Sequence, residues 1–296
     1  MADVNLSEFA YLSAVDEYTD YVVYKKLSGL GFEKRHRFSG TLKRLATMEY
    51  GHYKFWSRYC PERKVTVSNL KVYFIIFIRL LLGVTFAVKF LERNEKNTIN
   101  KYKAVSRQIP QRDRLQFNRM VADEVEHENR FAGQFDEPHI KYISFIVLGL
   151  ADALVEIAGI HAGSLGIYDQ TELAGLAGII AGAAASIAMA SAAYAQAKTG
   201  FKGSASLSAV YTGASYFVTA LILATPYFLT KMMVDALTAS LALAVVLIAF
   251  ISFYGSVISG AVFKKDFIEI SSIMFGATVA LYLIGLVIRY LTRISI

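Results

Sequence analysis

The sequence is short of cysteine throughout and short of charge over its second half. Cys60 is the only cysteine among 296 residues, which excludes an intrachain disulfide and a zinc site built from several cysteines. The first residues show no charged stretch followed by an apolar core, so no cleavable signal peptide is expected. No base-reading motif accompanies the basic residues, which argues against nucleic acid as a partner.

Charge divides the chain into two parts. Up to residue 140 there are 23 basic and 17 acidic residues, whereas the remainder carries only 8 and 7. A chain that is 55% hydrophobic is too apolar for an ordinary soluble protein of this length. We therefore predict an all-α protein with a charged domain over residues 1–138 and a membrane domain over residues 139–296.

Five apolar stretches follow residue 141, and each is long enough for the ~20 residues of a membrane-spanning helix. An odd number of spans places the two termini on opposite sides, with the lysines after the second and fourth spans on the side of the basic first domain. The positive-inside rule then predicts an integral protein of the cell membrane with a cytoplasmic N-terminal domain, although the arginines near the C-terminus oppose this. The stretches are approximately 142–167, 173–197, 207–230, 233–260 and 270–290.

The first domain has helical spacing of apolar residues over 7–28 and 33–58, and Ser7 is the expected N-cap of the first helix. A fourth helix is expected over about 111–135, after the turn at Pro110. These helices carry most of the candidate site residues.

The third helix of this domain is expected to run without interruption from Val72 past Glu92 to Glu95, because those carboxylates need a rigid support. Its apolar part, Val72 to Val88, is at the short limit for a membrane span. We expect that part to be buried, or to contact a partner subunit or the bilayer surface.

The most informative motif is Glu-x-x-His, which occurs at Glu49–His52 and again at Glu124–His127. Residues three apart share one face of a helix, so each motif places a carboxylate beside an imidazole. Two such pairs on facing helices can enclose two metal ions. Solvated surface charges are the alternative, but the repeated spacing favours a metal site formed by Glu17, Glu49, His52, Glu92, Glu95, Glu124 and His127.

The order of these residues, together with Tyr24 and Tyr102, resembles the rubrerythrin and erythrin branch of ferritin-like proteins. The stretch Phe86 to Glu95 is similar to the membrane-bound ferritin subgroup. The resemblance covers about residues 5–135 and implies a ferritin-like four-helix bundle that binds two irons and oxidises Fe(II) with oxygen or peroxide. The four cysteines of a rubredoxin-like iron site are absent. Ligand type alone leaves manganese or zinc open as alternatives to iron.

The membrane domain carries two carboxylates inside its first span. Asp152 and Glu156 lie one helical turn apart, and a charge within a span is costly enough to mark a functional position. Met189 in the second span offers a thioether, which is more often packing than a ligand, and His161 is open to either interpretation.

The segments from Leu148 to Glu156 and from Ala188 to Tyr194 resemble the vacuolar iron transporter family, which also has five spans. The resemblance implies that Asp152, Glu156 and Met189 line a transport path. Ala153, Ala188 and Ala193 depart from the residues usual in that family, and residues 198–206 are too short for the helical domain that some members carry there.

Small residues are frequent in the first two spans, as in Gly159-x-x-x-Gly163 and Gly178-x-x-x-Gly182. Such residues let helix backbones approach closely within lipid, and a homodimer is the expected context.

Two hypotheses follow for the function. The first is an Fe²⁺ transporter, coupled to protons and acting in export, whose cytoplasmic di-iron domain captures iron and can oxidise it. The second is a membrane-anchored di-iron oxidase or peroxide scavenger that transports nothing.

Overall fold

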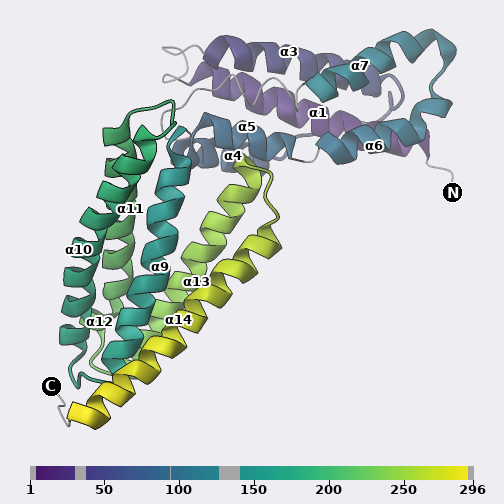
Figure 1. Ribbon diagram of the computed structural model, residues 1–296. Helices are drawn as coiled ribbons and strands as arrows, with labels where there is room; N and C mark the ends of the chain where they lie inside the picture. The colour runs from purple at the N-terminus through teal and green to yellow at the C-terminus, as the bar shows by residue number, and fades with distance from the viewer. Residues whose placement is uncertain (1–4, 31–37, 94, 127–140, 293–296) are drawn as a thin grey trace. The chain divides into compact units, whose positions relative to one another are not determined.

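The computed structural model describes residues 5–30, 38–93, 95–126 and 141–292, and every regular element within them is a helix (Figure 1). The chain divides into two compact units, Met1–Glu137 and Pro138–Ile296. The all-helical prediction is confirmed for the described residues. We describe each unit by itself.

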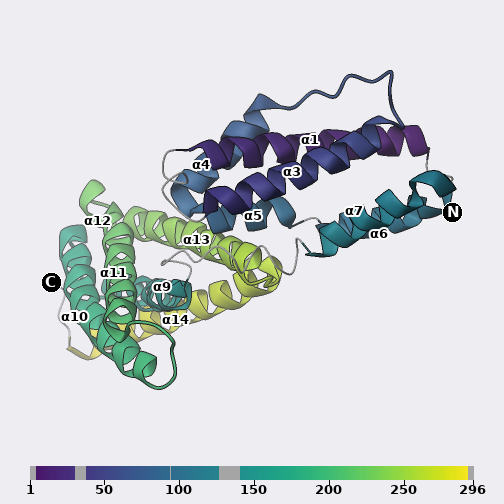
Figure 2. The same ribbon diagram turned by 90° about the horizontal axis from the view of Figure 1, so that it is seen from above.

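Unit 1 is built on a pair of long helices, α1 (Leu6–Gly29) and α3 (Phe38–Ser57), which pack along each other (Figures 1 and 2). The N-cap of α1 is Asn5, whose side chain accepts hydrogen bonds from the backbone amides of Ser7 and Glu8. The prediction of Ser7 as the cap is therefore wrong by two residues. An asparagine is as good an N-cap as a serine, and the sequence offers both.

The predicted continuous third helix is instead broken. Helix α4 (Asn69–Leu82) ends at Gly83, which has a φ of 92°, and α5 (Val84–Glu92) begins directly after it. Helix α6 (Glu95–Val105) is a separate element. A positive φ is easily adopted only by glycine, so Gly83 redirects the chain where a rigid helix was expected.

The remaining helix of unit 1 is α7 (Arg114–Glu126), preceded by two short 3₁₀ turns, η1 (Ser106–Gln108) and η2 (Gln111–Asp113). The fourth helix was predicted over about 111–135, and α7 begins three residues later than that, at Arg114. The predicted end at 135 lies outside the described residues. Helices α6 and α7 pack on α1 and α3 through a common core, whose fully buried members include Phe55, Trp56 and Tyr102.

Unit 2 contains five helices that are long and apolar enough to cross a membrane, as predicted from the apolar stretches. The third of these regions, Ala205–Leu229, consists of α11 and the short helix α12 (Pro226–Leu229), with Thr225 between them. This composition is that of an integral membrane protein. The long helices are α9 (Ile143–Leu165), α10 (Thr171–Lys198), α11 (Ala205–Ala224), α13 (Met233–Ile258) and α14 (Phe263–Thr292).

Helix α9 is the centre of unit 2 and packs against α10, α11, α13 and α14. Its glycines make the closest approaches: Gly163 faces Gly285 of α14, where an added Cβ would overlap the Gly163 carbonyl oxygen. On α10, Gly182 faces Ala220 of α11. The predicted close pairing of helices is confirmed, but its partners lie in the same chain. These motifs therefore give no support for a dimer.

Candidate metal centre

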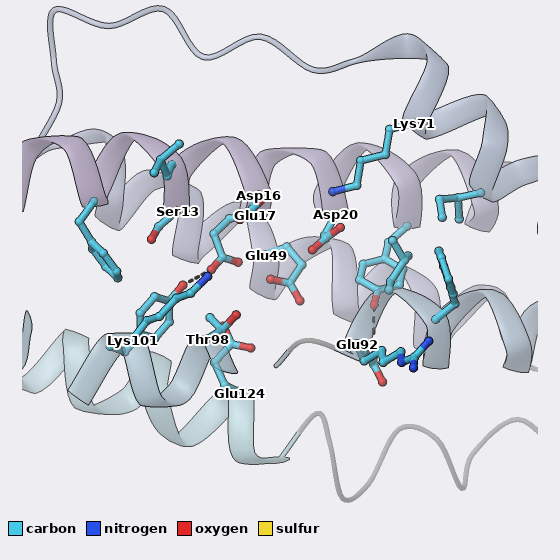
Figure 3. A pocket seen from close by; sticks show the side chains of 18 of the residues that line it. Ser13, Asp16, Glu17, Asp20, Glu49, Lys71, Glu92, Thr98, Lys101 and Glu124 are labelled. Carbon is cyan, nitrogen blue, oxygen red and sulfur yellow. Dashed lines mark hydrogen bonds between the residues drawn. The ribbon is translucent and has the colours of Figure 1, made fainter. Parts of the chain in front are cut away.

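Three helices of unit 1 bring together the acidic residues that the repeated motif predicts. Glu17 comes from the middle of α1, Glu49 and His52 from one face of α3, and Glu124 from the end of α7. All four side chains are buried. Figure 3 shows Glu17, Glu49 and Glu124 pointing toward one another.

The four side chains form a compact set in which one potential ligand atom from each lies within 4.8 Å of all the others. His52 is at its centre, because its Nδ1 lies 3.1 Å from Glu124, 3.3 Å from Glu49 and 3.5 Å from Glu17. The i to i+3 spacing on α3 explains why Glu49 and His52 meet. The two other carboxylates arrive from different helices.

The cluster contains three buried carboxyl groups and only one imidazole to balance their charge. Burial raises the pKa of Glu49 well above its usual value, and burial with the neighbouring Glu17 raises that of Glu124. Burial would lower the pKa of His52, but the surrounding carboxylates, Asp123 first, raise it well above its usual value. For Glu17 the effect of burial is outweighed by His52, and its pKa is lowered.

This donor set fits a divalent cation. Three buried carboxylates around one imidazole carry more negative charge than a single imidazolium can balance, and a metal ion would supply the difference. Oxygen donors with one nitrogen suit iron or manganese, and they also permit zinc. The cluster can therefore hold one metal ion, with Glu17, Glu49, His52 and Glu124 as its ligands.

A second acidic region continues from this cluster along the same pocket, which has a volume of about 840 Å³. Glu92 lines the pocket, and its Oε1 accepts a hydrogen bond of 3.2 Å from the Tyr24 hydroxyl. Asp20 lies near it with Lys71 directed toward it (Figure 3). Burial raises the pKa of both Glu92 and Asp20 to about 8. The pocket therefore offers further carboxylates beyond the four-residue cluster.

Two predicted ligands cannot be placed. Glu95 opens α6, but its side chain lies outside the described residues, and so does His127. The described part of the chain thus brings together four of the seven predicted ligands and sets Glu92 in the same pocket.

Two buried aromatic side chains are joined to the cluster by hydrogen bonds. The Tyr102 hydroxyl donates a hydrogen bond to Glu17 and accepts one of 3.2 Å from Trp56 Nε1. Both rings are fully buried. This arrangement orients Glu17 and helps lower its pKa.

Sequence reasoning missed two acids of the site. Asp123 Oδ2 lies 3.6 Å from His52 Nε2, and Asp20 lines the pocket with one buried oxygen that has no hydrogen bond in the described structure. Asp123 directly precedes Glu124, and Asp20 follows Glu17 by three residues. The helical i to i+3 rule applied to Glu17 would have found Asp20.

The carboxylates of the first span are partly buried on α9. The Tyr216 hydroxyl of α11 donates a hydrogen bond of 2.6 Å to Glu156 Oε2. Met189 of α10 packs against the apolar core formed by α9, α11 and α13. Tyr216 could not be found from the sequence, because nothing in a span indicates which residue of another span it faces.

His161 occupies a different environment from the two carboxylates of α9. It is fully buried, and its Nδ1 lies 3.5 Å from Ser240 Oγ. Its ring centroid lies 4.2 Å from that of Tyr227, with the two ring planes tilted by 38°. Its Nε2 has no hydrogen bond within the described chain and points at Gly178, where a Cβ would collide with it. The packing interpretation of His161 is the one that the contacts support.

The structural observations therefore describe a buried acidic cluster suited to a cation and a separate unit with five membrane-length helices. No family model, no curated protein and no solved structure matches this chain.

Proposed function

We propose that the protein is an Fe²⁺ transporter in which unit 1 captures the ion and unit 2 carries it across the membrane. The observation that carries this proposal is the buried group of Glu17, Glu49, His52 and Glu124 in a chain that also has five membrane-length helices. A membrane anchor alone would need one span and no carboxylates within it.

In this proposal unit 1 is a ferritin-like four-helix bundle formed by α1, α3, α6 and α7. Their shared core and the convergence of ligands from α1, α3 and α7 support it. Glu92 extends the acidic surface beyond the first cluster, which supports a second metal position in the same pocket. Glu95 and His127 complete the ligand set that the resemblance implies.

In unit 2, Asp152 and Glu156 are the residues that we assign to the transport path. A carboxylate can bind either a proton or a cation, so ion movement and proton movement in opposite directions can share these groups. The hydrogen bond from Tyr216 holds Glu156 in one orientation and ties α9 to α11. Met189 contributes a soft donor at the edge of the same helix group.

The positions of the basic residues support an orientation of the protein, and that orientation favours one direction of transport. Short basic stretches share a side with unit 1 and favour a cytoplasmic unit 1, namely Lys198 and Lys202 after the second span and Lys264 and Lys265 after the fourth. A cytoplasmic collector loads from the cytoplasm. We therefore propose export, driven by protons that enter as iron leaves.

The test is anaerobic Fe²⁺ movement in proteoliposomes under a pH gradient of each sign. We expect flux that reverses with the gradient and is abolished by Asp152→Ala, while metal bound to unit 1 is retained. Asp235→Ala is the matched control, because Asp235 is an exposed carboxylate in the first turn of α13. Absence of Fe²⁺ movement under both gradients would reject the transport proposal.

A second candidate is a membrane-bound oxidase, favoured by the aromatic residues behind the cluster. Trp56, Tyr102 and Glu17 form a hydrogen-bonded line that ends at the candidate ligands, and indole and phenol side chains can pass electrons. In this reaction each Fe(II) gives up one electron, and oxygen or peroxide accepts it.

Oxygen and peroxide consumption measured on the same proteoliposomes separates the two candidates. Turnover that Tyr102→Phe slows, with no Fe²⁺ flux under either gradient, would establish the oxidase and exclude transport. Flux under anaerobic conditions would show that transport needs no oxidation.

A further inference from the structure

The exposed apolar surface of unit 1 is concentrated on one helix. Outside α4, the described residues of unit 1 include only two exposed large apolar side chains, Leu12 and Leu115. The six on α4 expose between 52% and 82% of their surface, and they are Leu70, Tyr73, Phe74, Phe77, Leu80 and Leu81.

These six side chains form one continuous face. Their spacing of three, four and seven residues places them within about a third of the helix circumference. The opposite face carries Val72, Ile75 and Ile78, which are buried within unit 1. Helix α4 is thus apolar on both sides but is packed on only one.

Helix α4 is too short to cross a membrane. Its 14 residues extend about 21 Å at the usual helical rise, whereas a bilayer core is about 30 Å thick. The break at Gly83 prevents α5 from lengthening it. A short helix with an exposed aromatic and leucine face is the type that lies within a membrane interface.

Within the sequence of α4 and its flanks the charges have one sign, although Lys71 faces Asp20 of α1 and Arg63 pairs with Glu8. Between Glu62 and Glu92 the sequence has no acidic residue and five basic ones, namely Arg63, Lys64, Lys71, Arg79 and Lys89. Lys26 of α1 adds an ammonium group 4.6 Å from the ring of Tyr73. Anionic lipid headgroups complement this charge. A second copy of α4 would instead bring the same positive charge against it.

A short connection links unit 1 to the first membrane-length helix. Only 16 residues separate the end of α7 at Glu126 from the start of the first membrane-length helix at Ile143, and they can extend at most about 55 Å. A bilayer that holds α9 therefore lies within about 55 Å of the end of α7.

We propose that α4 is an interfacial helix that binds the surface of an anionic bilayer through Leu70, Tyr73, Phe74, Phe77, Leu80 and Leu81. The same helix forms part of the wall of the acidic pocket through Lys71, Phe74 and Ile75. Lipid binding thereby places the pocket next to a negatively charged surface, where divalent cations are concentrated. The proposal does not depend on which metal, if any, the pocket binds.

The test uses the full chain in liposomes of phosphatidylcholine and phosphatidylglycerol, with lipids brominated on the acyl chain as quenchers. Phe77→Trp places an indole on the exposed face of α4. The native Trp56 is fully buried and supplies a constant background. Leu115→Trp is the matched control, because Leu115 is 67% exposed on α7 and outside the proposed surface.

We expect the Phe77→Trp emission to shift to shorter wavelength and to fall as bromolipid is added, more strongly for bromines near the headgroup than for bromines near the bilayer centre. The Leu115→Trp signal should not respond. Equal responses of the two variants would overturn the proposal. Protection of Phe77→Trp from iodide without quenching by bromolipid would overturn it too, because a protein surface would then cover the helix. Quenching that is unchanged in phosphatidylcholine alone would refute the role of anionic lipid.

Discussion

The two units of the chain use buried polar groups and glycines in opposite ways. Unit 1 gathers three carboxylates and an imidazole into its interior, and its notable glycine, Gly83, serves to redirect the backbone. Unit 2 has few charges, and glycines such as Gly163 and Gly285 let its helices touch. Unit 1 is thus organised around a buried acidic cluster that could hold a metal ion, whereas unit 2 is organised around close helix contact.

The largest expected effect concerns the acidic cluster. Replacing His52 by alanine, or Glu124 by glutamine, removes a candidate ligand and should weaken metal binding by about 100-fold or more, the upper range for losing even a supporting residue. The measurement is equilibrium binding of Fe²⁺ or Mn²⁺ to the full chain under anaerobic conditions. Glu62→Gln is the control, because Glu62 is exposed and lies outside the cluster. Equal metal affinity of all three variants would show that His52 and Glu124 are not metal ligands.

The next effect concerns helix contact in unit 2. Gly285→Ala drives a methyl group into the Gly163 carbonyl and should destabilise unit 2 by roughly 1–3 kcal/mol, the usual result of overpacking. Gly276→Ala in the same helix meets nothing within 4 Å and should be tolerated. Survival of the folded protein after heating in detergent, followed by size-exclusion chromatography, measures both. If both variants behave alike, close approach does not organise unit 2.

A third prediction concerns the glycines of unit 1. Gly83→Ala forces a side chain into a backbone region with a φ of 92° and should cost about 1–3 kcal/mol. Gly51→Ala, in the interior of α3 with open space around it, should instead stabilise by about 0.5–1 kcal/mol. Thermal unfolding followed by Trp56 fluorescence reports on this core. A change of the same sign in both variants would contradict this prediction.

The smallest effect is a surface contribution in unit 1 that depends on pH. The hydrogen bond of 2.7 Å from the Tyr59 hydroxyl, with Arg58 and Arg112 nearby, lowers the pKa of Asp113. Folding therefore gains stability from this group above its unfolded pKa of about 3.9, and loses that gain as the pH falls through the lower folded value.

Asp113→Asn should accordingly lower the Tm slightly at pH 7, and by less at about pH 3, where part of the gain in the wild type has been lost. Thermal unfolding of the variant and the wild type at both pH values is the measurement. A difference between the two proteins that grows toward acid would show that the sign is wrong.

Local patterns explain what could be read from the sequence. Five apolar stretches of sufficient length predict five membrane-length helices, and three-residue spacing predicts that Glu49 and His52 share a face. Both depend on neighbouring residues alone. The prediction of an uninterrupted helix through Gly83 failed because apolar spacing continues across a glycine whose backbone turns away.

Contacts between distant helices could not be read in this way. The pairing of Tyr216 with Glu156, and of Gly163 with Gly285, depends on which helices become neighbours. Asp123 reaches His52 only because α7 lies beside α3. Single-sequence spacing contains no information about such neighbours, so the sequence points to candidate residues but not to their partners.

Capture by unit 1 and transport by unit 2 can be tested together by measuring anaerobic Fe²⁺ flux and bound metal on the same proteoliposomes. We expect Asp152→Ala to lose flux while unit 1 retains its metal, and Glu49→Gln to lose that metal and to show slower flux. Undiminished flux in both variants would contradict the assignment of capture to unit 1 and of transport to the carboxylates of α9.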